Sequence, residues 1–227
     1  MLEIPFDHDF SEWTAERFIE ELLVDTIGLH HFLAGPDCRF GRQRAGDAGM
    51  LREFGERAGF TVESVEPVVA LGGVVSSSRI RKLVSSAGDV AAAGRLLGRP
   101  VRLSGTVIKG DQRGRTIGFP TLNLHLGSTV RPALGVYAVR VGIFEGGETI
   151  WHDGVANVGK RPTFGGEDVI LEAHLMDFSG DLYGKLIAVT LIDFIRAEKK
   201  FDGLEALRAQ IAADTKTAQN ILAEAPA

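Results

Sequence analysis

The sequence predicts two parts: an α/β region over residues 1–98, and a mainly antiparallel β-barrel over residues 99–227 that ends in a C-terminal helix. In the first part, helical and strand-like segments alternate, which is typical of α/β proteins. After Gly98-Arg99-Pro100, β-like runs follow one another at near-regular spacing and are separated by Gly, Asp and Pro turns. The change from alternating helical and strand-like segments to successive β-like segments places the boundary between the two parts near residue 99.

The elements of the first part follow from hydrophobic spacing and turn residues. A helix begins at Ser11, because Phe18, Leu22 and Leu23 recur at helical spacing after it. A short buried strand then ends at Gly35. The remaining expected elements are a helix over 47–58, a strand over 60–65, and helices over 76–83 and 89–97.

The second part is rich in β-like segments and closes with an amphipathic helix. The expected strands cover residues 101–108, 135–144, 149–158, 169–178 and 185–195. After Phe201, four apolar residues lie on one side of the expected helix: Leu204, Leu207, Ile211 and Ala218. We interpret this stripe as core-facing.

Composition limits the class of protein. The chain has 227 residues, 44% hydrophobic and 24% charged, with a formal net charge of −5 and a pI of about 5.7. This acidic balance argues against a general binder of nucleic acid or anionic membranes. The single cysteine, Cys38, cannot form an internal disulfide, and no apolar run reaches the roughly 18 residues of a membrane helix. We expect a cytoplasmic protein.

The segment from Lys109 to Leu124, KGDQRGRTIGFPTLNL, combines glycines, arginines and a Pro-Thr-x-Asn sequence. Glycines let backbone N–H groups approach an anion closely, and amides in a turn can bind it. Thr121 and Asn123 would leave a strand on the same face, and their oxygens suit Mg²⁺. The pattern indicates a site for a nucleotide triphosphate and its metal, and an ordinary hairpin turn is the alternative.

The run VILEAHLMDF places polar residues on one face of a strand. Glu172, His174 and Met176 alternate there with apolar residues on the other face. A carboxylate inside an apolar strand is costly to bury unless it is paired or functional, and the alternative is a solvent-facing Glu on an edge strand. His174 is either a second base or a supporting residue. The other histidines have no metal-binding spacing, so we expect no zinc site.

GRTIGFPTLN resembles the Gly-rich loop and PTAN motif of riboflavin kinases, with Leu122 where the family usually has alanine. VILEAHLMDF is similar to the family's (V/L)E-x-H-(L/I)-x-D-F. The resemblance implies a riboflavin kinase-like barrel that uses ATP and Mg²⁺ to convert riboflavin to FMN. It implies Glu172 as the catalytic base and Thr121 and Asn123 as metal ligands. The implied ATP and phosphate site comprises Gly110, Arg113, Gly114, Arg115, Gly118, Thr121 and Asn123.

The run GVANVGKRPTFGG, residues 154–166, also resembles the riboflavin kinase family, as a Gly/Pro-rich loop that forms a flap over the substrate. The resemblance implies that Asn157 and Arg161 belong to this flap, and an inert hairpin with two surface cations is the alternative. Asp177 is a candidate ligand of a ring or ribityl hydroxyl, with turn-capping as the alternative. Arg196 is a candidate for approach to the flavin.

The first 98 residues resemble the back half of the adenylyltransferase module in bifunctional bacterial FAD synthetases, a Rossmann-like nucleotidyltransferase domain. GPDCRFG resembles G-x-D/N-F-x-F-G, with Cys38 in place of an aromatic residue, and VSSSRIRKL resembles S-S-T-x-I-R. An ordinary N-cap is the alternative reading of VSSSRIRKL. The implied remnant of the adenylyltransferase site comprises Asp37, Ser76, Ser77, Arg79 and Arg81.

The chain has no H-x-G-H sequence, which the family's adenylyltransferase uses to bind ATP phosphates. We therefore expect a partial domain that exposes apolar surface, and an FMN-to-FAD activity that is lost or impaired. The leading expectation is a riboflavin kinase whose partners are ATP, riboflavin and FMN. The alternatives are a non-catalytic flavin-binding barrel and, disfavoured by acidity and few aromatic residues, a nucleic-acid-binding barrel.

Overall fold

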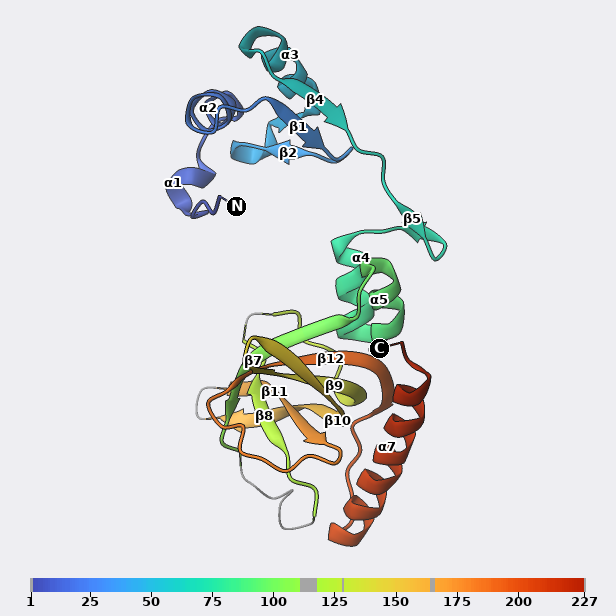
Figure 1. The fold of residues 1–227 in the computed structure, drawn as a ribbon. Helices are drawn as coiled ribbons and strands as arrows, with labels where there is room; N and C mark the ends of the chain where they lie inside the picture. Colours follow the sequence, from blue (N-terminus) through green and yellow to red (C-terminus); the bar gives the residue numbers. More distant parts are fainter. Residues whose placement is uncertain (1, 111–117, 128, 164–165, 227) are drawn as a thin grey trace. The chain divides into compact units, whose positions relative to one another are not determined.

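The computed structural model in Figure 1 describes residues 2–110, 118–127, 129–163 and 166–226. For the described residues between 161 and 167, it describes the backbone only. The chain divides into two compact units, Met1–Val74 and Val75–Ala227. The first unit is a small α/β unit, and the second contains the barrel.

The first unit is built around one β–α–β connection. Strand β1 (His31–Ala34) pairs in parallel with β4 (Thr61–Ser64), and helix α3 (Ala48–Ala58) connects them. The Asp47 carboxylate caps α3 by accepting the Met50 N–H at 3.0 Å, and this hydrogen bond lowers the pKa of Asp47. A parallel pair joined by a helix is the expected α/β pattern. The remaining strands and 3₁₀ helix of this unit are β2 (Arg39–Phe40), η2 (Arg42–Arg44), β3 (Gly46–Asp47), β5 (Val69–Ala70) and β6 (Gly73–Val74).

The long helix expected from Ser11 is instead broken into pieces. They are α1 (His8–Ser11), α2 (Ala15–Arg17) and the π-helical η1 (Phe18–Thr26). The break has a local cause: the Thr14 hydroxyl accepts the Arg17 N–H at 3.2 Å and so caps a new helix start. Ile19 and Leu23 still face the core of this unit.

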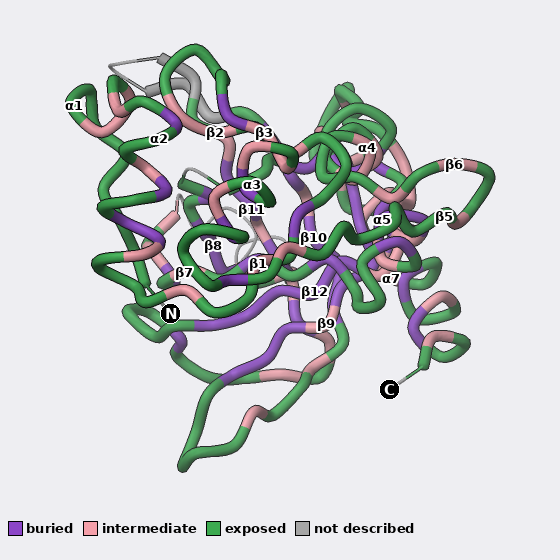
Figure 2. Tube along the Cα trace, turned by 90° about the horizontal axis from the view of Figure 1, so that it is seen from above, coloured by how far each residue is buried: buried purple, intermediate pink, exposed green. Residues whose placement is uncertain are grey.

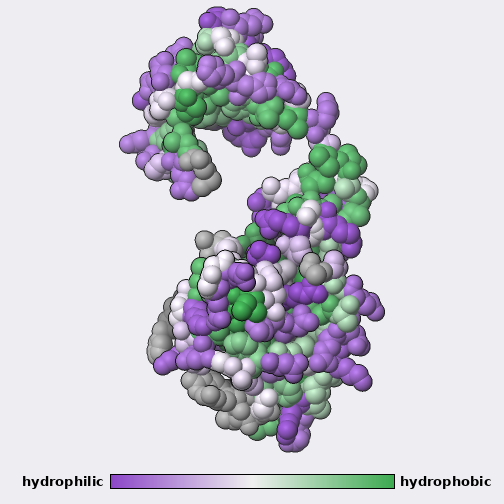
Figure 3. All heavy atoms as spheres, in the orientation of Figure 1, coloured by the Kyte–Doolittle hydropathy of each residue, from purple (hydrophilic) through white to green (hydrophobic). Residues whose placement is uncertain are grey.

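Apolar side chains are exposed around the β5–β6 hairpin, where Figure 3 shows hydrophobic atoms at the surface. These exposed residues are Val65, Val68, Val69, Leu71 and Val74. The finding agrees with the expectation that the first part of the chain exposes apolar surface.

The second unit is a closed barrel with the strand order β10-β11-β8-β7-β12-β9, in which every neighbouring pair is antiparallel and β9 closes onto β10 (Figure 1). This confirms the expected antiparallel barrel. The strands are β7 (Val101–Ile108), β8 (Leu122–His125), β9 (Gly135–Glu145), β10 (Glu148–Thr163), β11 (Gly166–Leu175) and β12 (Leu186–Ala197). Closure leaves no sheet edge open.

The core of the second unit fills the barrel interior, and buried residues concentrate on its strands (Figure 2). Alternate residues of β8 and β11 enter this core, among them Leu122, Leu124, Leu171 and Ala173. Because the side-chain period of a strand is two, the residues between them point to the outer face of the barrel.

The helices before the barrel pack on that core. They are α4 (Ser77–Lys82), the π-helical η3 (Leu83–Ala87) and α5 (Val90–Leu97). Val84, Val90 and Ala93 belong to the same buried cluster as the barrel strands. Contacts between residues therefore divide the chain after Val74, whereas the change in the pattern of the sequence falls at residue 99.

The C-terminal helix α7 (Leu204–Glu224) lies along the outer face of the barrel (Figure 1), and its second half is the anchored one. Ala218 and Leu222 pack there against Val136, Ala138 and other apolar residues of the strands. Arg140 of β9 donates to the Leu222 carbonyl at 3.0 Å and the Ala225 carbonyl at 3.1 Å, which stabilises the negative end of the helix. Across the part of the chain that the structure describes, no helix combines the length and apolarity needed to span a membrane.

Candidate functional site

Three polar residues stand in one row across the outer face of the barrel. In the strand register, Glu172 of β11 lies opposite Asn123 of β8 on one side and Asn157 of β10 on the other. Directly opposed residues of antiparallel strands project to the same face. The row is therefore a product of strand pairing, which brings together residues from separate segments of the chain.

Glu172 is half-buried on a strand with partners on both sides. This excludes the solvent-facing Glu of an edge strand, because β11 lies between β10 and β8 in a closed barrel. The placement leaves Glu172 facing a cavity, where a carboxylate can accept a proton from a bound hydroxyl.

Asn123 is only 4% exposed, and its Oδ1 atom is buried without a hydrogen-bond partner among the described residues. Gly110 passes so close to Asn123 that a Cβ there would lie 2.4 Å from Nδ2. Buried polar atoms are nearly always satisfied, so an unsatisfied oxygen calls for a ligand that the structure does not contain. A carbonyl-type oxygen of this kind suits a hard cation.

Two residues of the row, Glu172 and Asn157, line a cavity of about 560 Å³ between the outer face of the barrel and α7, which we call the helix-side cavity. Glu172, Asn157 and His174 line its polar side. Phe201, Leu204 and residues further along α7 line its apolar side. A mostly apolar cavity of this size with a few convergent polar groups is typical of a small-molecule site.

A second cavity of about 500 Å³ opens beside the barrel core, and we call it the core-side cavity. Its walls include core residues such as Val107 and Leu182 and the turn from Phe178 to Tyr183. Pro120 also lines it, and Thr121 lines both cavities. Two small molecules bound in these cavities would therefore meet at Thr121.

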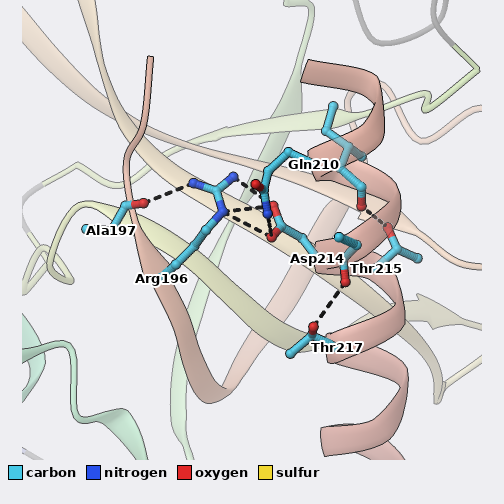
Figure 4. A network of polar contacts seen from close by, with 8 residues as sticks. Arg196, Ala197, Gln210, Asp214, Thr215 and Thr217 are labelled. Atoms are coloured by element: carbon cyan, nitrogen blue, oxygen red, sulfur yellow. Dashed lines mark hydrogen bonds and ion pairs between the residues drawn. The ribbon is translucent and has the colours of Figure 1, made fainter. Parts of the chain in front are cut away.

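Arg196 joins β12 to α7 at the wall of the helix-side cavity (Figure 4). Its Nη2 atom lies 2.7 Å from Asp214 Oδ2, and its Nε atom lies 3.0 Å from Oδ1. Gln210 donates to the same carboxylate at 2.9 Å. The Asp214 side chain is 5% exposed, so this is a buried bidentate ion pair that connects a cavity residue to the helix.

Of the other residues predicted for the ATP and flavin sites, some lie in described turns and others lie outside the described residues. Arg113, Gly114 and Arg115 lie outside the described residues, and Gly118 adopts a left-handed φ of +87°. Asp177 is in a turn after β11 and has a φ of +51°.

Residues 154–163, expected as a flap loop, are part of strand β10. Their pairing with β11 extends to Thr163↔Gly166, because the two strands form one long hairpin. The side chain of Arg161 lies outside the description, whereas Asn157 lines the helix-side cavity. The loop expectation was therefore wrong for the backbone.

The residues predicted for the adenylyltransferase remnant belong to different compact units. Asp37 is in the first unit, and Ser76, Ser77, Arg79 and Arg81 are in the second. The Ser76 hydroxyl accepts the Arg79 N–H at 3.3 Å, so Ser76 is an N-cap of α4, the alternative that the sequence left open. Burial raises the pKa of the neighbouring motif residue Cys38, and the nearby Asp37 carboxylate adds to this effect.

Sequence reasoning missed several residues of the helix-side cavity, namely Phe119, Glu198, Lys199, Phe201 and Asp214. The sequence left the role of His174 open. The apolar stripe of α7 was read as core, yet Leu204 is 68% exposed and lines the cavity with Leu207 and Ile211. These three residues lie far from Glu172 in the sequence, so no local pattern indicated that they share a cavity with it. Within the described ranges, no group of three or more His, Cys, Asp or Glu residues is arranged to hold a metal ion.

The fold and the site together define a closed β-barrel with two adjoining cavities of small-molecule size that share Thr121. Comparison with known proteins specifies the family. A family model described as riboflavin kinase matches residues 97–222, and one described as FAD synthetase matches residues 1–79. The chain belongs to the bifunctional riboflavin kinase/FMN adenylyltransferase family.

Similar proteins cover most of this chain. The bifunctional riboflavin kinase/FMN adenylyltransferase of Haemophilus influenzae is 42% identical over 94% of this chain and 68% of its own length. Those of Escherichia coli K12 and Pseudomonas fluorescens are 42% and 40% identical over 96% and 98% of this chain, with 69% and 70% of their own lengths covered. A solved structure from Streptococcus pneumoniae, described as a macrolide-efflux protein, is 36% identical with a TM-score of 0.81 over 95% of this chain and 68% of that one.

Proposed function

We propose that the chain transfers the γ-phosphoryl group of ATP to the ribityl 5′-hydroxyl of riboflavin, giving FMN and ADP. The observation that carries the proposal is the row of Asn123, Glu172 and Asn157 beside two cavities that share Thr121. Membership of the riboflavin kinase family supports it. Phosphoryl transfer requires mainly positioning and charge stabilisation, which two adjoining cavities supply.

The two substrates occupy different cavities. Riboflavin takes the helix-side cavity, because Phe201, Leu204 and Leu207 offer apolar surface to a planar ring and Glu172 lies on the opposite polar side. ATP takes the core-side cavity and reaches Thr121 with its phosphates. Asn157 and Arg196 line the flavin cavity, and Arg161 and Asp177 are flavin-binding candidates from the sequence.

Glu172 acts as the general base. Its carboxylate takes the proton of the 5′-hydroxyl as the oxygen attacks the γ-phosphorus and the bond to the β-phosphate oxygen breaks. A carboxylate is a weak base for an alcohol, but it serves when the proton moves late in a loose transition state.

Thr121 and Asn123 hold Mg²⁺. The buried Oδ1 of Asn123, which has no partner among the described residues, fits an oxygen-preferring cation, and Thr121 lines both cavities. A Mg²⁺ ion held by these two residues would supply positive charge to the transferring phosphates. Backbone amides from Gly110 to Gly118, with Arg113 and Arg115, complete the phosphate site.

Residues 1–98 form the adenylyltransferase region of the chain and residues 99–227 the kinase domain. The 227-residue chain has no H-x-G-H sequence, so by itself it converts FMN to FAD poorly or not at all. It acts in the cytoplasm on ATP, riboflavin and FMN, without nucleic acid or membrane partners. The acidic net charge of −5 and the single Cys38 support this setting.

The test is to incubate the purified chain with riboflavin, ATP and Mg²⁺ and to separate the flavins by chromatography. FMN without FAD is the expected result. FAD as well would contradict the proposed loss of adenylylation. Absence of FMN with riboflavin still bound would reject the kinase and favour the non-catalytic flavin-binding barrel.

Glu172→Gln separates catalysis from binding, because the amide keeps the shape of the side chain and loses the base. We expect turnover to fall by a factor of about 100 or more, in the range of general-base catalysis, with riboflavin affinity unchanged. Glu148→Gln is the matched control, since Glu148 is an exposed carboxylate at the start of β10. Full activity in the Glu172→Gln variant would reject the role of Glu172 as base.

A further inference from the structure

His174 lies on β11 two residues after Glu172, so both side chains project from the same outer face of the barrel. It is half-buried and lines the helix-side cavity with Phe119 and Thr121. The sequence left its role open between a second base and a supporting residue. The contacts of its ring decide between them.

The hydrogen bond of the His174 ring fixes its tautomer. Nδ1 lies 2.9 Å from the carbonyl oxygen of Pro120. A carbonyl oxygen can only accept, so Nδ1 must carry the proton and donate it. The ring also packs edge-on against Phe119, with centroids 5.3 Å apart and an interplanar angle of 79°. Both contacts tie the ring to the segment that precedes Thr121.

That segment lies where the strand ladder stops. The register between β8 and β11 ends at the pair Leu122↔Ala173, so it does not include Pro120 or Thr121. His174 is one residue past that end on β11, and its side chain bonds to Pro120, two residues before Leu122. A side chain of the Glu172 strand thus holds the backbone next to Thr121.

We propose that His174 is a positioning residue, which fixes Phe119–Thr121 against the Glu172 strand through its Nδ1–H bond to Pro120. The proposal rests on the proposed kinase function, in which Thr121 and Glu172 face the same transferring group from different strands. A shift of about 1 Å between reacting groups can cost a factor of about 100 in rate. The bond therefore acts on the transfer step more than on the affinity for either substrate.

Two substitutions distinguish positioning from base chemistry. The side-chain amide of Asn reaches about as far as Nδ1 of His and can still donate to Pro120, whereas that of Gln reaches about as far as Nε2. For His174→Asn we expect kcat within about threefold of the wild type. For His174→Gln we expect kcat to fall by a factor between about 10 and 100, with the KM values for riboflavin and ATP within about threefold.

Equal kcat values for His174→Asn and His174→Gln would overturn the proposal, whether both variants are active or both are inactive. Equilibrium unfolding in a Trp13→Phe background, monitored by Trp151 fluorescence, checks that each variant is folded. A second measurement needs no variant: ¹⁵N NMR of the neutral wild-type ring should report the Nδ1-protonated tautomer. The Nε2-protonated tautomer would overturn the proposal.

These outcomes are distinct from failure of the proposed function. If the wild-type chain forms no FMN, the kinase assignment fails and the positioning role in that reaction fails with it. The tautomer then still reports whether the bond between His174 and Pro120 exists.

Discussion

Arg196→Met and Asp214→Leu each remove one half of the buried ion pair between β12 and α7. We expect the two substitutions to lower the free energy of unfolding by different amounts. The Asp214 side chain is 5% exposed and the Arg196 side chain is 23% exposed. Each substitution leaves the other charge behind, and the penalty depends on how far water can reach that charge. The more buried partner is therefore the more costly one to leave alone.

The contacts set the expected magnitudes. Arg196→Met leaves the Asp214 carboxylate with the Gln210 amide, at 2.9 Å, as its remaining side-chain donor, so we expect a loss of about 3–5 kcal/mol in the free energy of unfolding. Asp214→Leu leaves a guanidinium that still donates to the Ala197 carbonyl at 2.9 Å and is partly solvated. We expect that loss to be smaller, about 2–3 kcal/mol.

The double variant completes the thermodynamic cycle. With both charges replaced by apolar groups, the cost should fall to about 0–2 kcal/mol, so the two substitutions should be strongly non-additive. The assay is equilibrium unfolding in urea, followed by the fluorescence of Trp151 in the barrel. A Trp13→Phe background removes the signal of the first unit. Additive costs, or a larger loss for Asp214→Leu than for Arg196→Met, would refute the reasoning.

Two further predictions concern Tyr137 and Gly110. Tyr137 is fully buried, and burial raises its pKa from 10.0 to about 12. The contribution of the neutral Tyr137 side chain to the free energy of unfolding is therefore complete below pH 10. It is lost as the pH rises toward 12, by up to about 1.4 kcal/mol per pH unit. Tyr137→Phe should lack this decline when unfolding free energies are compared at pH 9 and 11.5, and parallel curves would contradict it. Gly110→Ala should lower FMN formation at least about tenfold, because its Cβ would lie 2.4 Å from Nδ2 of the buried Asn123, whereas Gly94→Ala in α5 meets its nearest atom at 3.5 Å and should leave activity unchanged. Equal activity of the two glycine variants would show that the approach of Gly110 to Asn123 is unimportant.

Short-range patterns in the sequence predicted much of the fold. Alternation in VILEAHLMDF placed Glu172 and His174 on one face of a strand, and the barrel shows them on its outer face. The helix expected over 47–58 is α3, which spans Ala48–Ala58. The pattern failed before Phe18, where one hydroxyl at Thr14 restarts the helix. Such a side-chain bond competes with the apolar period that suggested a single helix.

Long-range contacts were beyond the sequence. The apolar residues of α7, all expected to face the core, divide into two groups. Ala218 is buried on the barrel, whereas Leu204 lines the helix-side cavity. Likewise, the change in the pattern of the sequence at residue 99 does not mark the contact boundary, because Val84 and Val90 complete the barrel core. The choice of partner for an apolar face is made by packing and not by its spacing.

By itself, the sequence determined the chemistry available to this protein: a Gly-rich segment, a Thr and an Asn at strand spacing, and a carboxylate among apolar residues. Tertiary structure alone decided that Asn123, Glu172 and Asn157 form one row, because that row depends on the register of the β10–β11 hairpin and on its pairing with β8, which lies far from β11 in the chain. It also decided that His174 reaches Pro120 and that Asp214 is buried against Arg196. Hydrogen bonds and ion pairs of this kind depend on distances of a few tenths of an ångström, which only the packed barrel and its helix fix.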